Sequence, residues 1–249
     1  MREGGSRSSS IDNARDKGIQ VLAEVYPDNF GGSIVAADYL HPDNYQKNMD
    51  RDYKDIIETA NVTPLTKERY EELVATAPST SIMFYNATEE TVYQALAHPN
   101  TVLGSDAFPY TVRDGGATAV DWDTPYNAVN GHPRGAGAHA RLLRLVREKK
   151  IDIPLPLAVS KMTYMIAKFL ADNGVTQMAR KGRVQEGSDA DLAIFDPGTV
   201  TDNSTMQDGG LPSTGIPYVV VNGTVVVNNS EVLKDVFPGK PVRCSGTVG

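Results

Sequence analysis

The chain has 249 residues, a formal net charge of −7 and a pI of about 5.1, with 40% hydrophobic and 22% charged residues. These values are ordinary for a soluble globular protein, and an acidic chain without basic clusters is a poor candidate for binding nucleic acid or an anionic membrane. The single cysteine, Cys244, excludes an intrachain disulfide and a CxxC zinc site. No apolar run approaches a membrane span and residues 1–10 lack a signal-peptide core, so we expect a flexible leader, no membrane partner and a cytoplasmic location.

The first elements predicted are a helix and a buried strand. Ser10 can cap a helix that runs to Lys17 and ends at Gly18. Residues 19–26 are mostly apolar and predict a strand that Pro27 stops. This order is typical of a βα-repeat protein.

Residues 28–80 have a different character, because they are polar and rich in Asp, Asn and Tyr. Two helices are predicted there, over 44–60 and over 66–76, the second capped by Thr66. The segment is far longer than an ordinary βα loop of about 2–6 residues. Insertions of this kind are often lids over a site.

The α/β pattern resumes with a strand over 81–85, a helix that Thr88 caps and that runs to about Ala97, and a strand over 101–106. This spacing predicts parallel βαβ packing of the two strands. A loop rich in Gly, Pro and Asp follows over 107–136, and helices are predicted over 137–149 and 156–172.

After Gly174, glycines divide the chain into short β-branched segments. Strands are predicted over 191–195 and 218–221, and Asn222-Gly223 is typical of a tight hairpin. An α/β portion, 1–173, is therefore expected to precede a small all-β portion, 174–249.

Asp106 is the sharpest candidate for chemistry. It ends an apolar strand before a long irregular loop, at the strand end where parallel α/β folds bind ligands. A carboxylate there can ligate a divalent cation and shuttle a proton. The alternative, equally compatible with its position, is an Asp that caps a turn.

Arg134, in His132-Pro133-Arg134-Gly135, is the second candidate. Its planar fork suits a substrate carboxylate, although its spacing favours a surface or structural ion pair. The four histidines form neither HxH nor HExxH, so none has local metal-ligand spacing. His132 lies nearest the candidate site, and His98, which precedes Pro99 in a turn, is interpreted as structural.

Taken in order, several segments resemble the metal-dependent amidohydrolase superfamily, and most closely its N-acyl-D-amino-acid deacylase (D-aminoacylase) branch. The Gly187-to-Asp196 stretch is typical of the superfamily, whereas Tyr26-Pro27 and His132-Pro133-Arg134-Gly135 point to the branch. The other matching pieces are residues 102–106, 156–163 and 219–223.

The resemblance implies the last strands and helices of a (β/α)8 TIM barrel with a small carboxy-terminal β-sandwich portion. Asp106 would bind the catalytic Zn²⁺ and transfer a proton from the attacking hydroxide to the leaving amine. Arg134 would bind the substrate α-carboxylate, Tyr26 would contact the substrate, with a packed strand residue as its alternative, and Ser33 would be its partner. Residues 28–80 would form the lid.

The family's other metal ligands would lie upstream of residue 11, and six barrel strands would be missing from this chain. The resemblance therefore implies an enzyme that deacylates N-acyl-D-amino acids, with this chain lacking most metal ligands. One alternative is a non-catalytic fragment or subunit that a second polypeptide completes. Another is a cyclic-amide hydrolase of the dihydroorotase or hydantoinase kind, which the Tyr-Pro and His-Pro-Arg-Gly pieces disfavour.

Overall fold

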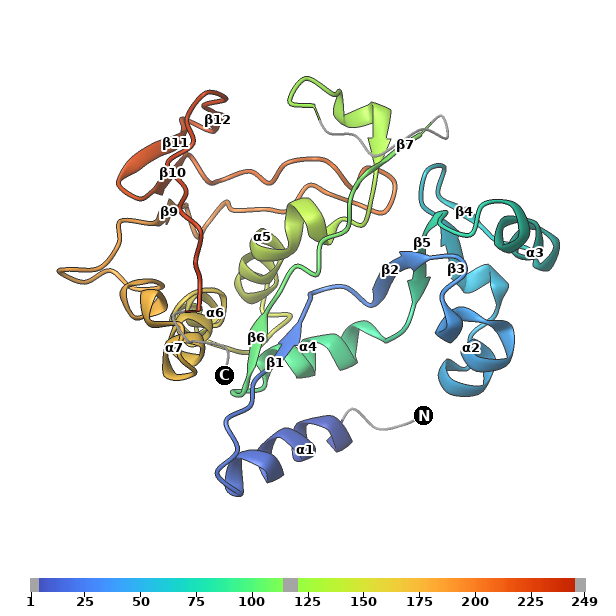
Figure 1. The fold of residues 1–249 in the computed structure, drawn as a ribbon, viewed down its shortest axis with the longest axis horizontal. Coiled ribbons are helices and arrows are strands. Elements are labelled where there is room, and N and C mark those ends of the chain that lie inside the picture. Colours follow the sequence, from blue (N-terminus) through green and yellow to red (C-terminus); the bar gives the residue numbers. More distant parts are fainter. Residues whose placement is uncertain (1–4, 114–120, 245–249) are drawn as a thin grey trace.

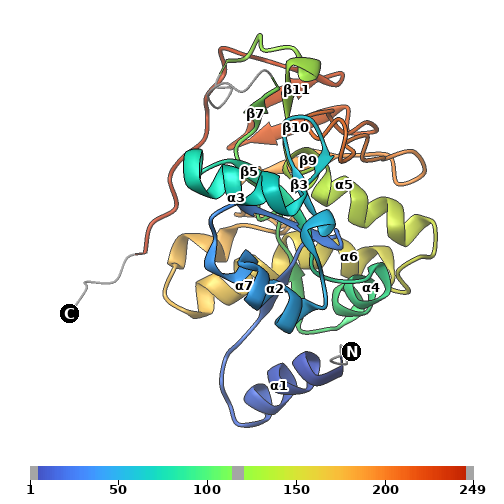
Figure 2. The ribbon, with the colours of Figure 1, turned by 90° about the vertical axis from the view of Figure 1, so that its right-hand side faces the viewer.

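A computed structural model describes residues 5–113 and 121–244. Residues 1–4, where the predicted leader begins, lie outside these described ranges. The chain is a mixed α/β protein in which β1 (Ala23–Val25) and β6 (Thr101–Leu103) lie side by side near the middle (Figure 1). Figure 2 shows α1 at one end of the molecule and β9–β11 at the other. The α-helices are α1 Gly5–Asp16, α2 Pro42–Met49, α3 Lys67–Thr76, α4 Glu89–Ala97, α5 Arg134–Arg147, α6 Leu155–Met162 and α7 Tyr164–Asp172.

The β1–β6 pair is parallel, with Ala23 opposite Thr101 and Val25 opposite Leu103. Side chains alternate along strands, and Val25 and Leu103 pack on one face against α4, α5 and α6. The predicted strand over 19–26 shortens to three residues because β6 begins only at Thr101, so residues 19–22 have no partner in its ladder. Within the described chain, β1 pairs with β6 alone.

The segment after β1 forms a sheet of its own, with strand order β2-β5-β3-β4. It consists of β2 Phe30–Ile34, β3 Ile56–Glu58, β4 Thr63–Pro64 and β5 Ser81–Tyr85. All of its pairings are antiparallel. The predicted parallel packing of strands 81–85 and 101–106 is therefore wrong, because β2 and β3 occupy both edges of β5. We call residues 30–85 the insertion sheet region.

The insertion sheet region has its own core, in which α2 and α3 cover one face of the sheet. Tyr45, Tyr70 and Leu73 from these helices pack on Ile82 and Phe84. Thr66 caps α3 as predicted, accepting a hydrogen bond from the Arg69 N–H. The predicted helix over 44–60 ends at Met49, because Asp50 adopts a left-handed conformation and the chain then enters β3.

Two other helix predictions needed correction. Helix α1 begins at Gly5, so Ser10 lies inside it and does not cap it. The helix predicted over 156–172 is interrupted at Thr163, whose φ of −138° and ψ of −84° are not helical, and this gives α6 and α7. The Thr88 cap of α4 is confirmed, because its hydroxyl accepts from the Thr91 N–H.

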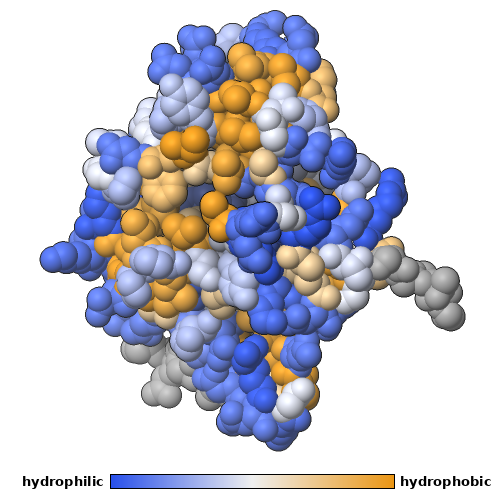
Figure 3. Space-filling view, turned by 90° about the vertical axis from the view of Figure 1, so that its left-hand side faces the viewer, coloured by the Kyte–Doolittle hydropathy of each residue, from blue (hydrophilic) through white to orange (hydrophobic). Residues whose placement is uncertain are grey.

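A second antiparallel sheet, in strand order β12-β11-β10-β9, lies toward the carboxyl end. It contains β9 Leu192–Ile194, β10 Tyr218–Val221, β11 Thr224–Asn228 and β12 Glu231–Val232. The predicted hairpin is confirmed, because Asn222 and Gly223 both have positive φ, as a two-residue type I′ turn requires. Apolar side chains remain exposed on this sheet, among them Ile194, Tyr218 and Val225. The side of the molecule that carries it shows several hydrophobic areas (Figure 3).

The remaining elements are short: the two-stranded sheet of β7 Thr111–Val112 and β8 Val129–Asn130, and the 3₁₀ helices Asp38–Leu40, Tyr53–Asp55, Tyr126–Ala128 and Thr176–Arg180. None of the helices in the described ranges has the length and apolar character needed to cross a membrane.

Candidate functional site

Asp106 and Arg134, the two sharpest candidates from the sequence, form an ion pair. Arg134 Nη2 lies 2.7 Å from Asp106 Oδ2. Asp106 follows β6 by three residues and has a φ of 45°, and Arg134 is the first residue of α5. The carboxylate side chain is 62% exposed and the arginine side chain 1% exposed. The pair is thus a buried cation that presents one exposed carboxylate.

Tyr26 joins this pair from the end of β1. The Arg134 Cζ atom lies 4.3 Å from the centre of the Tyr26 ring, which is a cation–π distance. The Tyr26 hydroxyl accepts a hydrogen bond of 2.8 Å from Asn86 Nδ2. No local sequence pattern points to Asn86, because it is an exposed polar residue after β5 and its partner lies 60 residues away in the chain.

Ser33 lies on the other face of β2. Gly32 faces Arg134, and a Cβ added to it would be 3.7 Å from Arg134 Nη2. Since successive strand residues point to opposite faces, Ser33 points away, and its Oγ accepts a 2.6 Å hydrogen bond from the Tyr39 hydroxyl. The structure therefore brings Asp106, Arg134 and Tyr26 together and leaves Ser33 in the helix-covered face of the insertion sheet region.

Arg134 retains donors that no residue of the described chain uses. Its Nε and Nη1 atoms are buried and have no hydrogen-bond partner among the described residues. A buried polar group without a partner is costly, so such donors favour an anionic ligand as their partner. A carboxylate is the group that a guanidinium binds with two parallel hydrogen bonds.

Zinc does not fit the donors that the described chain assembles. His132, the nearest histidine, is 2% exposed and uses both ring nitrogens, with Nδ1 facing the Arg134 N–H and Nε2 the Phe30 carbonyl. Asp106 is already paired with Arg134. No group of three or more His, Cys, Asp and Glu in residues 5–113 and 121–244 could hold a metal ion.

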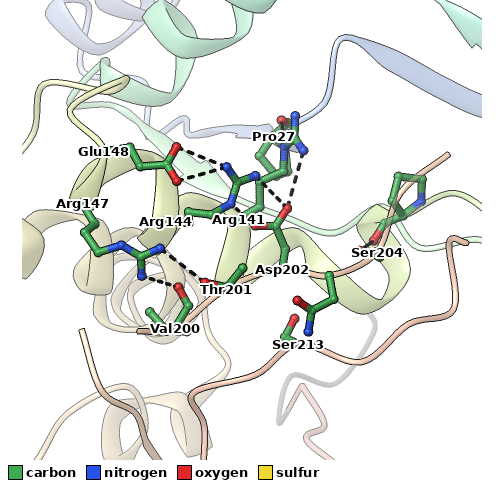
Figure 4. A network of polar contacts seen from close by, with 12 residues as sticks. Pro27, Arg141, Arg144, Arg147, Glu148, Val200, Thr201, Asp202, Ser204 and Ser213 are labelled. Carbon is green, nitrogen blue, oxygen red and sulfur yellow. Dashed lines mark hydrogen bonds and ion pairs between the residues drawn. The ribbon is translucent and has the colours of Figure 1, made fainter. Parts of the chain in front are cut away.

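A second polar cluster lies beside the site and joins the end of β1 to residues 200–204 through α5 (Figure 4). Arg144 forks onto Asp202 with distances of 2.5 and 3.0 Å, and Arg141 donates to the Pro27 carbonyl at 2.9 Å. Arg141 Nε also lies 3.5 Å from Asp28 Oδ1, which makes an ion pair. The spacing of the two arginines on one helix could have suggested a polar face, but not its partners.

Asp28, directly after Tyr26-Pro27, is the member of this cluster whose burial is energetically costly. It is 2% exposed and its Oδ2 atom has no partner in the described residues. Burial raises the pKa of Asp28 to about 6, although Arg141 opposes the shift. Asp28 is therefore a buried carboxyl that carries its charge at a cost.

The insertion sheet region is tied to the rest of the chain near the site. His132 Nε2 bonds the Phe30 carbonyl of β2 at 2.8 Å. Asn130 Nδ2 donates to the carbonyls of Thr59, at 2.8 Å, and Met206, at 3.0 Å. Arg113 Nη1 donates to the Ala60 carbonyl at 3.1 Å. A lid movement of this region would have to break these bonds.

Two cavities border the site region. One, of about 480 Å³, follows the open edge of β1 and includes Tyr26, Asp28 and Asn86 in its lining. A larger one, of about 670 Å³, lies between the insertion sheet region and residues 108–111 and contains the Glu58–Arg69 ion pair. Neither is lined by Asp106 or Arg134, so we place the candidate site by the ion pair and not by cavity size.

Comparison with known proteins gives consistent matches. The sequence model described as "Amidohydrolase family" matches residues 3–227. The chain is 29% identical over 232 residues to the N-acyl-D-glutamate deacylase of Alcaligenes xylosoxydans xylosoxydans, covering 88% of this chain and 41% of that protein. It is 33% identical over 151 residues to the N-acyl-D-aspartate deacylase of the same organism, covering 60% of this chain and 25% of that protein.

Solved structures match over nearly the whole chain. N-acyl-D-glutamate deacylase from Bordetella bronchiseptica, complexed with zinc and a phosphonate inhibitor, has a TM-score of 0.72 and 26% identity, over 96% of this chain and 46% of that chain. A D-aminoacylase structure has a TM-score of 0.69 at 23% identity, over 93% of this chain and 44% of that chain, and shows the shared fold. The chain thus spans less than half the length of these proteins.

Proposed function

We propose a function from one established premise: the chain belongs to the amidohydrolase family. In this proposal the chain is part of a hydrolase that removes the acyl group from N-acyl-D-amino acids. The similarity to two deacylases of acidic N-acyl-D-amino acids supports this substrate class. The observation that carries the proposal is the buried Arg134 next to Asp106, two of whose nitrogens have no partner among the residues that the structure describes.

Arg134 would bind the substrate carboxylate. Its guanidinium is fixed from one side by the Tyr26 ring, so the remaining donors have a defined direction. A substrate carboxylate bound there would compete with Asp106 for Nη2 and place the amide close to the Asp106 side chain. Asp106 would then hold the proton that the leaving amine needs when water has added to the acyl carbon.

The zinc of the Bordetella bronchiseptica relative supports a metal-dependent reaction in the whole enzyme. Because the donors described here do not assemble a zinc site, the other ligands would have to come from outside these residues. The partial barrel, the β-sandwich portion over 174–249 and a covering role for residues 28–80 belong to the same proposal.

A second candidate function is that of a subunit or fragment that another polypeptide completes. The two-stranded β1–β6 sheet favours it, because β1 has one unpaired edge in the described chain and exposed edges recruit further strands. The chain also covers only 41% of the length of the Alcaligenes N-acyl-D-glutamate deacylase. In this case the chain would supply Arg134 and Asp106 to a site whose metal ligands come from its partner.

An assay of the purified chain with zinc in the buffer tests the proposal, using N-acetyl-D-glutamate and N-acetyl-L-glutamate. Release of glutamate from the D form alone would support a deacylase active as this chain. Release from neither form, with binding of the D form retained, would support the incomplete site. Equal turnover of both forms, or binding of neither, would contradict the proposed substrate class.

A further inference from the structure

His132 occupies a fixed tautomer between two parts of the chain. Its Nδ1 atom accepts the Arg134 backbone N–H at 3.2 Å, so the ring hydrogen is on Nε2 and is donated to the Phe30 carbonyl at 2.8 Å. Burial lowers the pKa of His132 to about 3, which keeps the ring neutral. One side chain therefore joins the start of α5 to strand β2.

The same imidazole contacts the aromatic side chains around the site. It stacks on Phe30 with 4.5 Å between ring centres and an interplanar angle of 26°. The Tyr26 ring meets it edge-on at 6.1 Å. Gly32 also packs against it, since a Cβ there would lie 3.7 Å from His132 Cδ2. His132 thus contacts Tyr26 and Gly32, which both lie next to the Arg134 guanidinium.

These contacts give His132 a role that differs from binding zinc and from contacting the substrate. We propose that His132 is a positioning residue that holds the Arg134 guanidinium in place by fixing the start of α5 against β2 and the Tyr26 ring. The inference rests on the proposed function only in that Arg134 binds a carboxylate. The residue acts through Arg134 and takes no part in bond making.

The chain provides a matched control in its other histidine of the same local design. His98 also precedes a proline, and its Nδ1 atom also accepts the N–H two residues later, from Asn100 at 3.2 Å. Its Nε2 atom bonds Asp12 of α1 at 3.1 Å, at the amino-terminal side of β6 and away from Arg134. Replacing His98 removes a comparable pair of bonds and leaves the surroundings of Arg134 intact.

The first test compares His132→Phe with His98→Phe in binding N-acetyl-D-glutamate, measured by calorimetric titration of the chain. His132→Phe keeps a flat ring but loses both hydrogen bonds, and we expect about tenfold weaker binding. His98→Phe should stay within about twofold of the wild type. His132→Gln, which keeps a donor toward the Phe30 carbonyl, should recover part of the affinity. Equal effects of the two phenylalanine variants would overturn the positioning role.

The second test needs no substrate and so separates this inference from the proposed function. Phenylglyoxal modifies arginine, and mass spectrometry reports its rate at Arg134 relative to the 65% exposed Arg180. We expect His132→Phe, or His132→Gln if the former does not fold, to speed modification of Arg134, and His98→Phe to leave it slow. Unchanged rates would refute the positioning of Arg134. Faster modification without any binding of the acyl amino acid would refute only the carboxylate role.

Discussion

The chain builds the same His-Pro turn at two ends of the β1–β6 pair, and the two turns differ in what surrounds them. At residues 98–100 the imidazole faces Asp12 of α1, and the side chains of the pair are 16% and 45% exposed. At residues 132–134 it is 2% exposed and faces a backbone carbonyl. The local motif therefore sets the turn, whereas the neighbouring elements decide whether the turn anchors a helix or orders a candidate site.

The largest effect on stability is expected at the first turn, residues 98–100, where the buried Lys161 donates hydrogen bonds to the backbone. Its Nζ donates to the carbonyls of His98, at 2.5 Å, and Thr101, at 2.8 Å. Lys161→Ala leaves these acceptors and a cavity in a buried place, so we expect a loss of about 3–5 kcal/mol in the free energy of unfolding. Denaturant titration measures it, with Lys168→Ala as the exposed control. A loss no larger than the control's would show that this turn needs no such support.

The carboxyl groups near the two turns should give opposite pH dependences. Burial raises the pKa of Asp28, near the second turn, to about 6, so its contribution to stability is present below its unfolded pKa and is lost as the pH rises through 6. Asp28→Asn removes this loss. Relative to the wild type, we expect the variant to gain about 3 kcal/mol between pH 4 and pH 7. Urea unfolding at both pH values checks it, and a constant difference would contradict the charged burial.

His132 gives a smaller effect in the other direction. Its folded pKa of about 3 lies below the unfolded value, so its contribution to stability is present above about pH 6.5 and is lost as the pH falls. The destabilisation caused by His132→Phe should therefore shrink by about 2 kcal/mol from pH 7 to pH 5. The measurement is the difference in unfolding free energy from the wild type at each pH. A destabilisation that grows on acidification would mean that the ring is charged in the folded chain.

The smallest effect is expected for Asp12→Asn at the first turn. Hydrogen bonds from Asn100 and His98 hold the pKa of Asp12 below its usual range, so its contribution is present at neutral pH and fades on acidification. The pair is partly exposed, and we expect only a slight drop in melting temperature, with no drop at pH 3. A large drop would show that this turn is as tightly integrated as the second.

Local signals predicted much of the fold, and long-range pairings account for what was missed. The caps at Thr66 and Thr88 and the Asn222-Gly223 hairpin depend on residues within one turn, so the sequence predicts them. The partner of β5 does not follow from its apolar run, because an apolar strand fits parallel and antiparallel neighbours alike.

The residues of the candidate site divide in the same way, into those that local signals predict and those that depend on long-range contacts. Local position, at the end of a strand and just before a helix, singled out Asp106 and Arg134, whereas Tyr26 was expected only from the family resemblance. Asn86 and Asp28 were missed because each is defined by a partner on a distant element. The direction of Ser33 depended on the register of β2, which the sequence does not show.

Binding of a carboxylate by Arg134 is the central claim, and titration of three chains with N-acetyl-D-glutamate tests it most directly. Arg134→Met should abolish measurable binding, because the buried guanidinium is lost. Asp106→Asn removes the negative charge 2.7 Å from Nη2, so it should bind the D form tighter than the wild type, by roughly fivefold or about 1 kcal/mol. Binding by Arg134→Met with wild-type affinity would contradict the account.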